Sequence, residues 1–270
     1  MRTLKKVLLW TGGIVLLLYV AVCAFFYSRQ QQILFVPERL PAGFRYEFPG
    51  RYRECSIKLQ DGTVLSGLLF RAAADTPKGL LFYVHGNAGS LRTWGEIAEV
   101  YTATGYDLFM FDYRGYGISG SSITSEEQLY ADVQVAYDSM RALYPENRIV
   151  VLGYSIGTGP AAMLAAHNHP AHLVLQAPYY SMTDMMEHTY PFLPTFMLRF
   201  PLRTYEYAAK ANAPVTIFHG TEDGVLYYGS SLKLRKNFRP GDTLITIAGL
   251  GHNGFTTNGQ YLAGIRQILR

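Results

Sequence analysis

Residues 148–167 read RIVVLGYSIGTGPAAMLAAH, and they place a G-x-S-x-G motif between two runs of different character. The run before the motif is short, apolar and β-branched, which is typical of a buried strand. The run after it is rich in alanine, which favours a helix. A sharp turn between strand and helix strains the backbone at Ser155 and lifts its hydroxyl clear of the sheet. Because Gly153 and Gly157 have no Cβ, the strand and the helix can approach closely around the serine.

A serine hydroxyl is a weak nucleophile at neutral pH, so this motif requires a base and an acid that orients the base. In this arrangement they follow the nucleophile along the chain, the acid first and the histidine second. Asp223 follows the strand pattern of residues 214–218, at the strand end where open α/β sheets place their sites. After Asp223 the chain contains one histidine, His252, in a glycine-rich loop. The sequence therefore predicts a catalytic triad of Ser155, Asp223 and His252.

A loop after another buried strand supplies the expected oxyanion hole. Residues 80–84 form the strand pattern, and the run HGNAG that begins at His85 follows it. We expect the backbone N–H groups of Asn87 and Ile156 to donate hydrogen bonds to the oxygen of the reacting carbonyl. His85 is expected to brace this loop rather than to act as a base. Asp112 precedes the serine along the chain, which breaks the expected order, so a structural role is predicted for it.

These motifs resemble the α/β-hydrolase superfamily and, within it, the Bem46 or ABHD13-type branch of membrane-anchored serine hydrolases. The resemblance covers about residues 50–270. It is carried by the serine motif and by four further runs: YVHGNAGS at 83–90, DYRGYGISG at 112–120, HGTED at 219–223 and GHN at 251–253. It implies an α/β-hydrolase fold, the same triad, and ester or thioester substrates. Two runs near the expected pocket depart from the pattern of the branch, QAPYY at 176–180 and GVLY at 224–227.

From Leu80 onward, strand and helix patterns alternate, which predicts an α/β fold with a mostly parallel sheet and helices on both faces. The expected strands are 80–84, 107–111, 148–152, 172–176, 214–218 and 243–247. The expected helices are 92–104, 125–143, 156–167, 226–237 and 255–269. An Asp61-Gly62 pair between alternating segments predicts a hairpin at the start of this domain, which we place at residues 51–270.

The alternation is interrupted once, at about residues 178–212, where we expect a short cap insertion beside the active site. Its methionine and phenylalanine side chains suit an adaptable apolar wall for an acyl chain. The alternative is that these side chains pack the cap onto the domain. The predicted substrate-binding residues lie in the cap or beside the serine: Tyr154, Tyr179, Met182, Phe192 and Phe196.

The N-terminus carries a separate apolar segment. Residues 7–27 contain no charged residue, follow a basic start, and are long enough to cross a bilayer as a helix. We therefore predict an N-terminal transmembrane anchor over residues 1–27 and a juxtamembrane linker over 28–50. A cleaved signal peptide or a lipoprotein site at Cys23 is the alternative. The basic start favours a catalytic domain on the non-cytoplasmic side, although arginines after the span weaken that argument.

Composition narrows the remaining classes of function. A length of 270 residues with 49% hydrophobic residues suits one α/β domain with a large core. A net charge of +4 without a dense basic stripe gives no indication of nucleic acid binding. The two cysteines provide no disulfide framework, and His167, His169 and His172 have no acidic or cysteine partner nearby for a metal site.

The predicted reaction is the hydrolysis of carboxylic esters or thioesters through an acyl-enzyme, without metal or organic cofactor. The anchor and the apolar cap favour lipophilic acyl substrates. The expected partners are a small-molecule or lipid ester and the membrane, and nothing indicates an oligomeric state. A serine peptidase is the alternative among hydrolases. A catalytically silent, membrane-bound binding protein is the alternative from another class.

Overall fold

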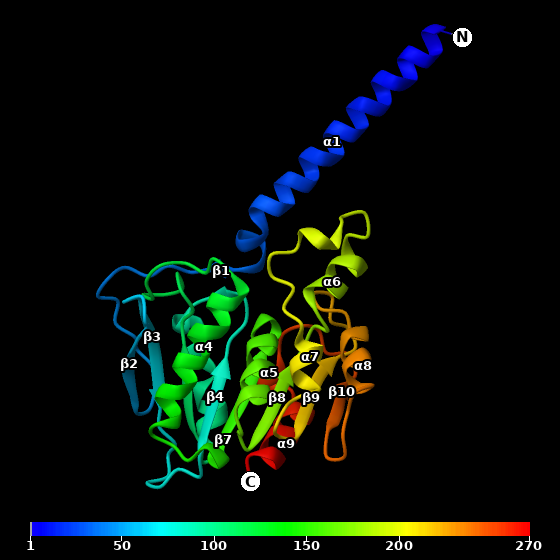
Figure 1. The fold of residues 1–270 in the computed structure, drawn as a ribbon. Coiled ribbons are helices and arrows are strands. Elements are labelled where there is room, and N and C mark those ends of the chain that lie inside the picture. Colours follow the sequence, from blue (N-terminus) through cyan, green and yellow to red (C-terminus); the bar gives the residue numbers. More distant parts are fainter. Residues whose placement is uncertain (1) are drawn as a thin grey trace.

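The computed structural model describes residues 2–270, which form a body built on one large sheet and a long helix that projects from it (Figure 1). Eight strands of the described chain make up this sheet, in the spatial order β10 (Thr243–Ile247), β9 (Val215–Gly220), β8 (His172–Gln176), β7 (Ile149–Tyr154), β4 (Leu80–Val84), β6 (Asp107–Phe111), β3 (Val64–Phe70) and β2 (Tyr52–Lys58). The β2–β3 and β3–β6 pairs are antiparallel, and the other neighbours are parallel. The predicted mostly parallel sheet is confirmed.

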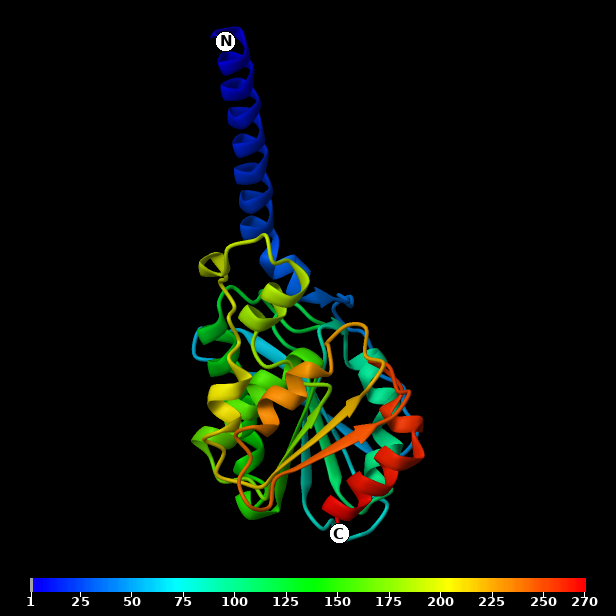
Figure 2. The ribbon, with the colours of Figure 1, turned by 90° about the vertical axis from the view of Figure 1, so that its right-hand side faces the viewer.

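Helices cover both faces of the sheet, as expected (Figures 1 and 2). One face carries α4 (Glu126–Arg141), α5 (Thr158–His167), α7 (Thr204–Ala208) and α8 (Gly229–Arg235). The other face carries α2 (Leu91–Trp94), α3 (Ala98–Thr102) and α9 (Gly259–Ile268). The helix predicted at 92–104 is divided, because a 3₁₀ turn at Gly95–Ile97 separates α2 from α3. Glycine is a poor helix former, and the ring of Phe48 fills the space where a Cβ of Gly95 would stand.

The core lies in two layers, one on each side of the sheet. Along β4, Leu80, Phe82 and Val84 pack in the layer beneath α4 and α5. Leu81 and Tyr83, which alternate with them, pack in the layer beneath α2, α3 and α9. Burial on both faces explains why the central strands read as continuous apolar runs in the sequence.

The cap segment consists of two different parts. Its first part contains α6 (Met182–Thr189) and a 3₁₀ turn at Thr195–Met197. Its second part returns to the body, where α7 packs against α5, and Phe200 and Leu202 are fully buried. Packing onto the domain therefore explains the apolar residues of the second part, whereas the first part stands over the end of the sheet.

The N-terminal helix α1 spans Arg2–Leu34 and projects away from the body on the side of the cap, opposite the C-terminus (Figures 1 and 2). It is long and apolar enough to cross a membrane, and its apolar part is not buried in the body. The helix also continues through residues 28–34 of the predicted linker, which contain no proline or glycine. Immediately after it, β1 (Val36–Pro37) pairs with β5 (Ala88–Gly89) in the expected oxyanion loop.

Candidate active site

The predicted turn between strand and helix forms at the end of β7. Ser155 has a φ of +54°, in the left-handed region that non-glycine residues rarely adopt. A Cβ on Gly153 would lie 2.5 Å from the carbonyl oxygen of Gly157, and a Cβ on Gly157 would lie 2.2 Å from the carbonyl oxygen of Val84. Both glycines are therefore required for the close approach that presents the serine.

The three side chains of the predicted triad lie in one hydrogen-bonded series. His252 Nε2 is 3.0 Å from Ser155 Oγ, and His252 Nδ1 is 2.8 Å from Asp223 Oδ2. The three residues follow β7, β9 and β10, so parallel strands bring them to the same edge of the sheet. This geometry permits His252 to take a proton from the serine while the carboxylate holds the opposite ring nitrogen.

Hydrogen bonds keep the carboxyl group of Asp223 ionised. Burial raises its pKa, but hydrogen bonds from His219, His252 and the N–H of Leu226 lower it by more, so that the pKa lies below the usual range of an aspartate. The N–H groups of Val225 and Leu226 donate to Asp223 Oδ1 at 2.9 and 2.8 Å. The same carboxylate can therefore both orient His252 and stabilise its protonated form.

His219 is a second histidine that contacts this carboxylate, and no role was predicted for it. Its Nε2 lies 3.2 Å from Asp223 Oδ2 and 2.9 Å from the carbonyl oxygen of Leu226. Because that carbonyl can only accept, Nε2 carries the proton, and Nδ1 accepts from the hydroxyl of Ser231 at 2.6 Å. The spacing His219-x-x-x-Asp223 at the end of one strand is the signal that could have identified it.

Hydrogen bonds hold the two peptide groups of the predicted oxyanion loop that lie on either side of Asn87. His85 Nδ1 donates to the carbonyl oxygen of Gly86 at 2.8 Å, which orients the peptide whose N–H belongs to Asn87. The carbonyl of Asn87 accepts from the N–H of Val36 at 2.9 Å and from the hydroxyl of Tyr116 at 2.6 Å. Among the described residues, no hydrogen-bond acceptor is paired with the N–H of Asn87. This N–H is therefore available to a ligand.

Beneath this loop lies a buried pair, His85 and Asp112. Burial lowers the pKa of His85 to about 4 and raises the pKa of Asp112 to about 8, so both side chains are neutral at pH 7. His85 Nε2 is 3.7 Å from Asp112 Oδ1, which also accepts from the N–H of Leu91 at 2.9 Å. Neither residue reaches Ser155, which agrees with the structural roles expected for them.

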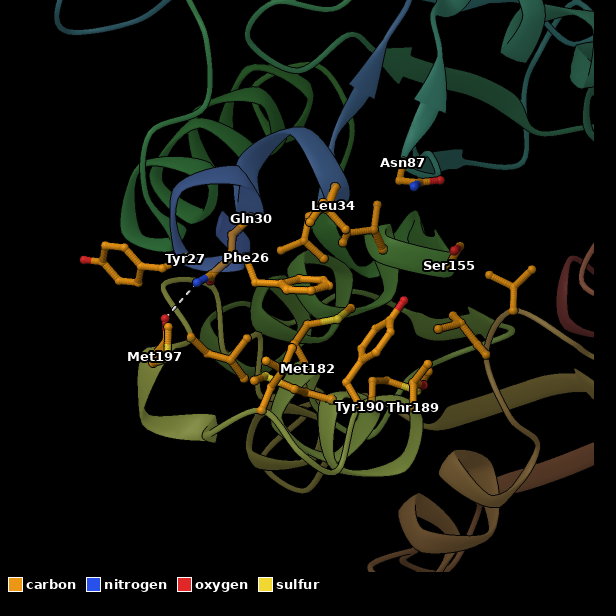
Figure 3. Close-up of a pocket in the computed structure, with 18 residues that line it drawn as sticks. Phe26, Tyr27, Gln30, Leu34, Asn87, Ser155, Met182, Thr189, Tyr190 and Met197 are labelled. Atoms are coloured by element: carbon orange, nitrogen blue, oxygen red, sulfur yellow. Dashed lines mark hydrogen bonds between the residues drawn. The ribbon is translucent and has the colours of Figure 1, made fainter. Parts of the chain in front are cut away.

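A cavity of about 340 Å³ opens over the serine (Figure 3). It is lined from the triad side by Asn87, Ser155, Ile156, Val225 and Leu226, from α1 by Phe26, Tyr27, Gln30, Ile33 and Leu34, and from the cap by Met182, Met185, Met186, Thr189, Tyr190, Leu193, Met197 and Leu198. Within the described part of the chain, no side chain on this lining carries a charge. Its size and apolar character are those of a small-molecule or acyl-chain site.

Of the five predicted substrate-binding residues, Met182 lines this cavity and the other four do not. Tyr154 packs in the layer beneath α2 and α9, and its hydroxyl lies 2.7 Å from Asn253 Oδ1, where it braces the His252 loop. Tyr179 is fully buried and donates to the carbonyl of Ile156 at 3.1 Å. Phe192 and Phe196 are exposed on the outside of the cap. Apolar composition alone did not distinguish the inner face of the cap from its outer face.

The α1 residues on the lining were not expected to belong to the site. Phe26, Gln30, Ile33 and Leu34 recur at helical spacing, so they lie on one face of α1. That spacing, with a polar Gln30 inside an apolar stripe, is the signal in the sequence that could have indicated a packed face rather than a linker.

Comparison with known proteins gives four further findings. A family model described as serine aminopeptidase, S33, matches residues 75–206. The chain is 32% identical over 208 residues to the human alpha/beta hydrolase domain-containing protein 17B. The aligned region covers 74% of this chain and 69% of that protein. Its fold is similar to an esterase of Pyrococcus furiosus, with a TM-score of 0.69, 18% identity and coverage of 87% and 96% of the two chains. It is also similar to a monoacylglycerol lipase of Paleococcus ferrophilus, with a TM-score of 0.60, 16% identity and coverage of 76% and 98%.

Proposed function

Because this chain belongs to the α/β-hydrolase superfamily, we propose that it is a serine hydrolase that cleaves carboxylic esters or thioesters of lipophilic acyl groups. One observation carries the proposal: the hydrogen-bonded series Ser155–His252–Asp223 ends at the floor of an uncharged, apolar cavity.

The reaction uses the geometry of the triad directly. His252 Nε2 removes the proton from Ser155 Oγ as the oxygen attacks the substrate carbonyl, and Asp223 stabilises the imidazolium that forms. The N–H groups of Asn87 and Ile156 stabilise the negative charge on the carbonyl oxygen. His252 then protonates the leaving alcohol or thiol and leaves an acyl-enzyme. It next removes a proton from water, which attacks the acyl carbon and releases the acid.

The cavity lining supports a lipophilic acyl group as the substrate. Four methionines contribute to the lining, and their flexible side chains adapt to an unbranched chain. Burying apolar surface is the only large favourable term that such a lining offers to a ligand. Among the polar residues of the lining, Asn87 lies near Ser155, where the ester itself would be held (Figure 3).

The proposal includes α1 as a single-pass membrane anchor. Its apolar residues are exposed along most of its length, which excludes the role of a core helix within the described structure. Arg2, Lys5 and Lys6 at its start favour a cytoplasmic N-terminus, which places the catalytic domain on the non-cytoplasmic side.

A serine peptidase is the second candidate, because the matching family model is described as a serine aminopeptidase. An aminopeptidase has to hold the ammonium group of its substrate, and a carboxylate is the usual partner for a buried cation. Among the described residues, the cavity lining contains no aspartate or glutamate. This difference favours the ester substrate.

Hydrolysis of a substrate panel by the purified full chain in detergent separates these functions. The panel contains p-nitrophenyl esters, an S-acyl thioester and aminoacyl p-nitroanilides, and the Ser155→Ala variant is the control for each. We expect hydrolysis of the esters and the thioester, lost in the variant, and none of the anilides. Hydrolysis of the anilides alone would make the protein a peptidase, and no hydrolysis by the folded protein would favour a binding protein.

A further inference from the structure

The last turns of α1 form one wall of the cavity that contains Ser155. Figure 3 draws Phe26 and Leu34 of α1 on one side of the cavity and Met182 and Tyr190 of the cap on the other. The serine lies at the end of the space between them. The cavity is therefore incomplete without the juxtamembrane end of the helix.

This wall is held in place from two sides. The buried side chain of Gln30 donates to the carbonyl of Met197 at 2.7 Å and accepts from the N–H of Arg199 at 2.7 Å. On the other side, the chain that leaves α1 donates from Val36 to the carbonyl of Asn87 at 2.9 Å. The helix, the cap and the expected oxyanion loop are therefore connected directly.

The tip of the cap, residues 190–196, lies beside the apolar part of α1. The hydroxyl of Tyr19 donates to the carbonyl of Phe192 at 2.9 Å, and the rings of Phe26 and Tyr190 are 5.6 Å apart. Three aromatic residues of the tip are exposed: Tyr190 by 42%, Phe192 by 57% and Phe196 by 87%. An exposed aromatic group next to an apolar helix is typical of a surface that contacts lipid.

The length of α1 places this tip at the depth of the bilayer. The uncharged part of the helix begins at Val7, and the rise from Val7 to Tyr19 is about 18 Å. A hydrocarbon core is about 30 Å thick, so residues after Tyr19 have to complete the span. The cap tip contacts the helix within this interval, at Tyr19 and Phe26.

We propose that the juxtamembrane end of α1 and the cap tip form an entrance to the acyl site that lies in the bilayer. The substrate is then a bilayer lipid ester with a single long acyl chain, which reaches Ser155 between α1 and the cap. Its chain leaves lipid and enters the apolar cavity without exposure to water. This inference rests on the proposed function, because it identifies the substrate class and the route to the same serine.

The depth of the cap tip can be measured without any activity. The full chain with Trp10→Phe is placed in nanodiscs whose lipids carry bromine on their acyl chains, and Phe192→Trp is compared with Leu143→Trp, the signal of Trp94 being subtracted with the Trp10→Phe protein alone. Leu143 has a similar exposure of 55% but precedes β7, at the opposite end of the sheet. We expect at least twofold stronger quenching of the tryptophan at position 192. Equal quenching at the two positions would overturn the membrane-embedded entrance.

The role of the α1 wall is tested by chain-length selectivity in the same nanodiscs. Leu34→Trp fills the cavity, so the ratio of kcat/KM for p-nitrophenyl dodecanoate to that for the acetate should fall at least tenfold. Leu17→Trp, on the exposed part of α1, is the matched control and should keep the wild-type ratio. Leu34→Ala enlarges the cavity and should shift the preference to a longer acyl chain. This variant tests the same wall if Leu34→Trp does not fold.

The outcomes separate the inference from the proposed function. If the wild type hydrolyses neither ester, the proposed function fails, and the quenching result still reports the position of the cap. If the wild type hydrolyses both esters but neither Leu34 variant changes the ratio, the α1 wall does not bind the acyl chain and the inference is wrong.

Discussion

The edge of the sheet that carries Ser155, Asp223 and His252, called the catalytic edge below, and the lining of the cavity are built in different ways. Ser155, Asp223 and His252 follow β7, β9 and β10, three parallel strands of one sheet, and a hydrogen bond joins each residue of the series to the next. The lining of the cavity instead combines the α1 wall with a cap more than 140 residues away in the chain, mostly through apolar contact. The difference indicates that the chemistry is determined locally, by motifs, whereas selectivity depends on how distant segments pack.

Removal of the predicted nucleophile should abolish most of the hydrolytic activity and leave the lining of the cavity unchanged. We expect Ser155→Ala to lower kcat for ester hydrolysis by about four to six orders of magnitude, as for other triad nucleophiles. The measurement is steady-state hydrolysis of p-nitrophenyl butyrate by the full chain in detergent. A loss smaller than about tenfold would mean that another group performs the chemistry.

His219 tests whether the catalytic edge extends beyond the triad. His219→Phe keeps an aromatic ring but removes the donor to Asp223, so we expect kcat to fall by about 10- to 100-fold with little change in KM, the size of effect that a small misplacement produces. His172→Phe is the control, because it removes a similar bond to Thr216 at the start of β8, away from the site. Equal kcat values in the two variants would contradict a positioning role.

The buried carboxyl group of Asp112, beneath the oxyanion loop, should make the stability of the folded protein depend on pH. Its pKa is about 8 in the folded protein and about 4 in an unfolded chain. The proton that it retains stabilises the folded state fully below about pH 4, and this contribution is lost as the pH rises toward 8. Asp112→Asn carries no such proton, so its stability relative to the wild type should increase over this range, on the order of a few kcal/mol.

The measurement is the difference in Tm between the variant and the wild type at several values from pH 5 to pH 8. Burial lowers the pKa of His85 in the folded protein to about 4, below this pH range, and its titration in the unfolded chain is common to both proteins. The exposed Asp75, changed to Asn, serves as the matched control, and its difference in Tm should not widen. A difference for Asp112→Asn that stays constant with pH would contradict a neutral buried carboxyl.

Gln30 tests the polar connection of the α1 wall to the chain at Met197 and Arg199, and we expect the smallest effect here. Gln30→Ala removes two hydrogen bonds, which should cost about 1–2 kcal/mol of stability. The preference for dodecanoate over acetate should fall about threefold, because the wall is then less firmly placed. Gln32→Ala, two residues further on an exposed position, is the control. Identical selectivity in both variants would mean that apolar contact alone holds the wall.

The catalytic edge was largely predictable because each of its parts is encoded in a short run. The central strands fall within a residue or two of their expected limits, and the predicted triad residues lie within hydrogen-bonding distance. The superfamily resemblance and the serine hydrolase class are confirmed by the comparisons, whereas the Bem46 or ABHD13-type branch and the catalytic roles stay predictions.

The lining of the cavity was not predictable from local sequence patterns. Phe192 and Phe196 are as apolar as Met182, and only the fold of the cap decides which of them faces the cavity. Residues 28–34 follow a span of bilayer length, which suggested a linker. Instead, Gln30, Ile33 and Leu34 line the cavity, and Gln30 is hydrogen-bonded to Met197 of the cap. A pairing between segments so distant in the chain leaves only a helical spacing in the sequence, and no motif.

The most direct test of the central claim is the reaction of the full chain with a fluorophosphonate, followed by identification of the modified residue by mass spectrometry. Such a probe reacts with an activated serine and loses fluoride. We expect one adduct on Ser155 of the folded wild type and none in the Ser155→Ala variant. A folded wild-type protein that is not labelled, or an adduct on a different serine, would contradict it.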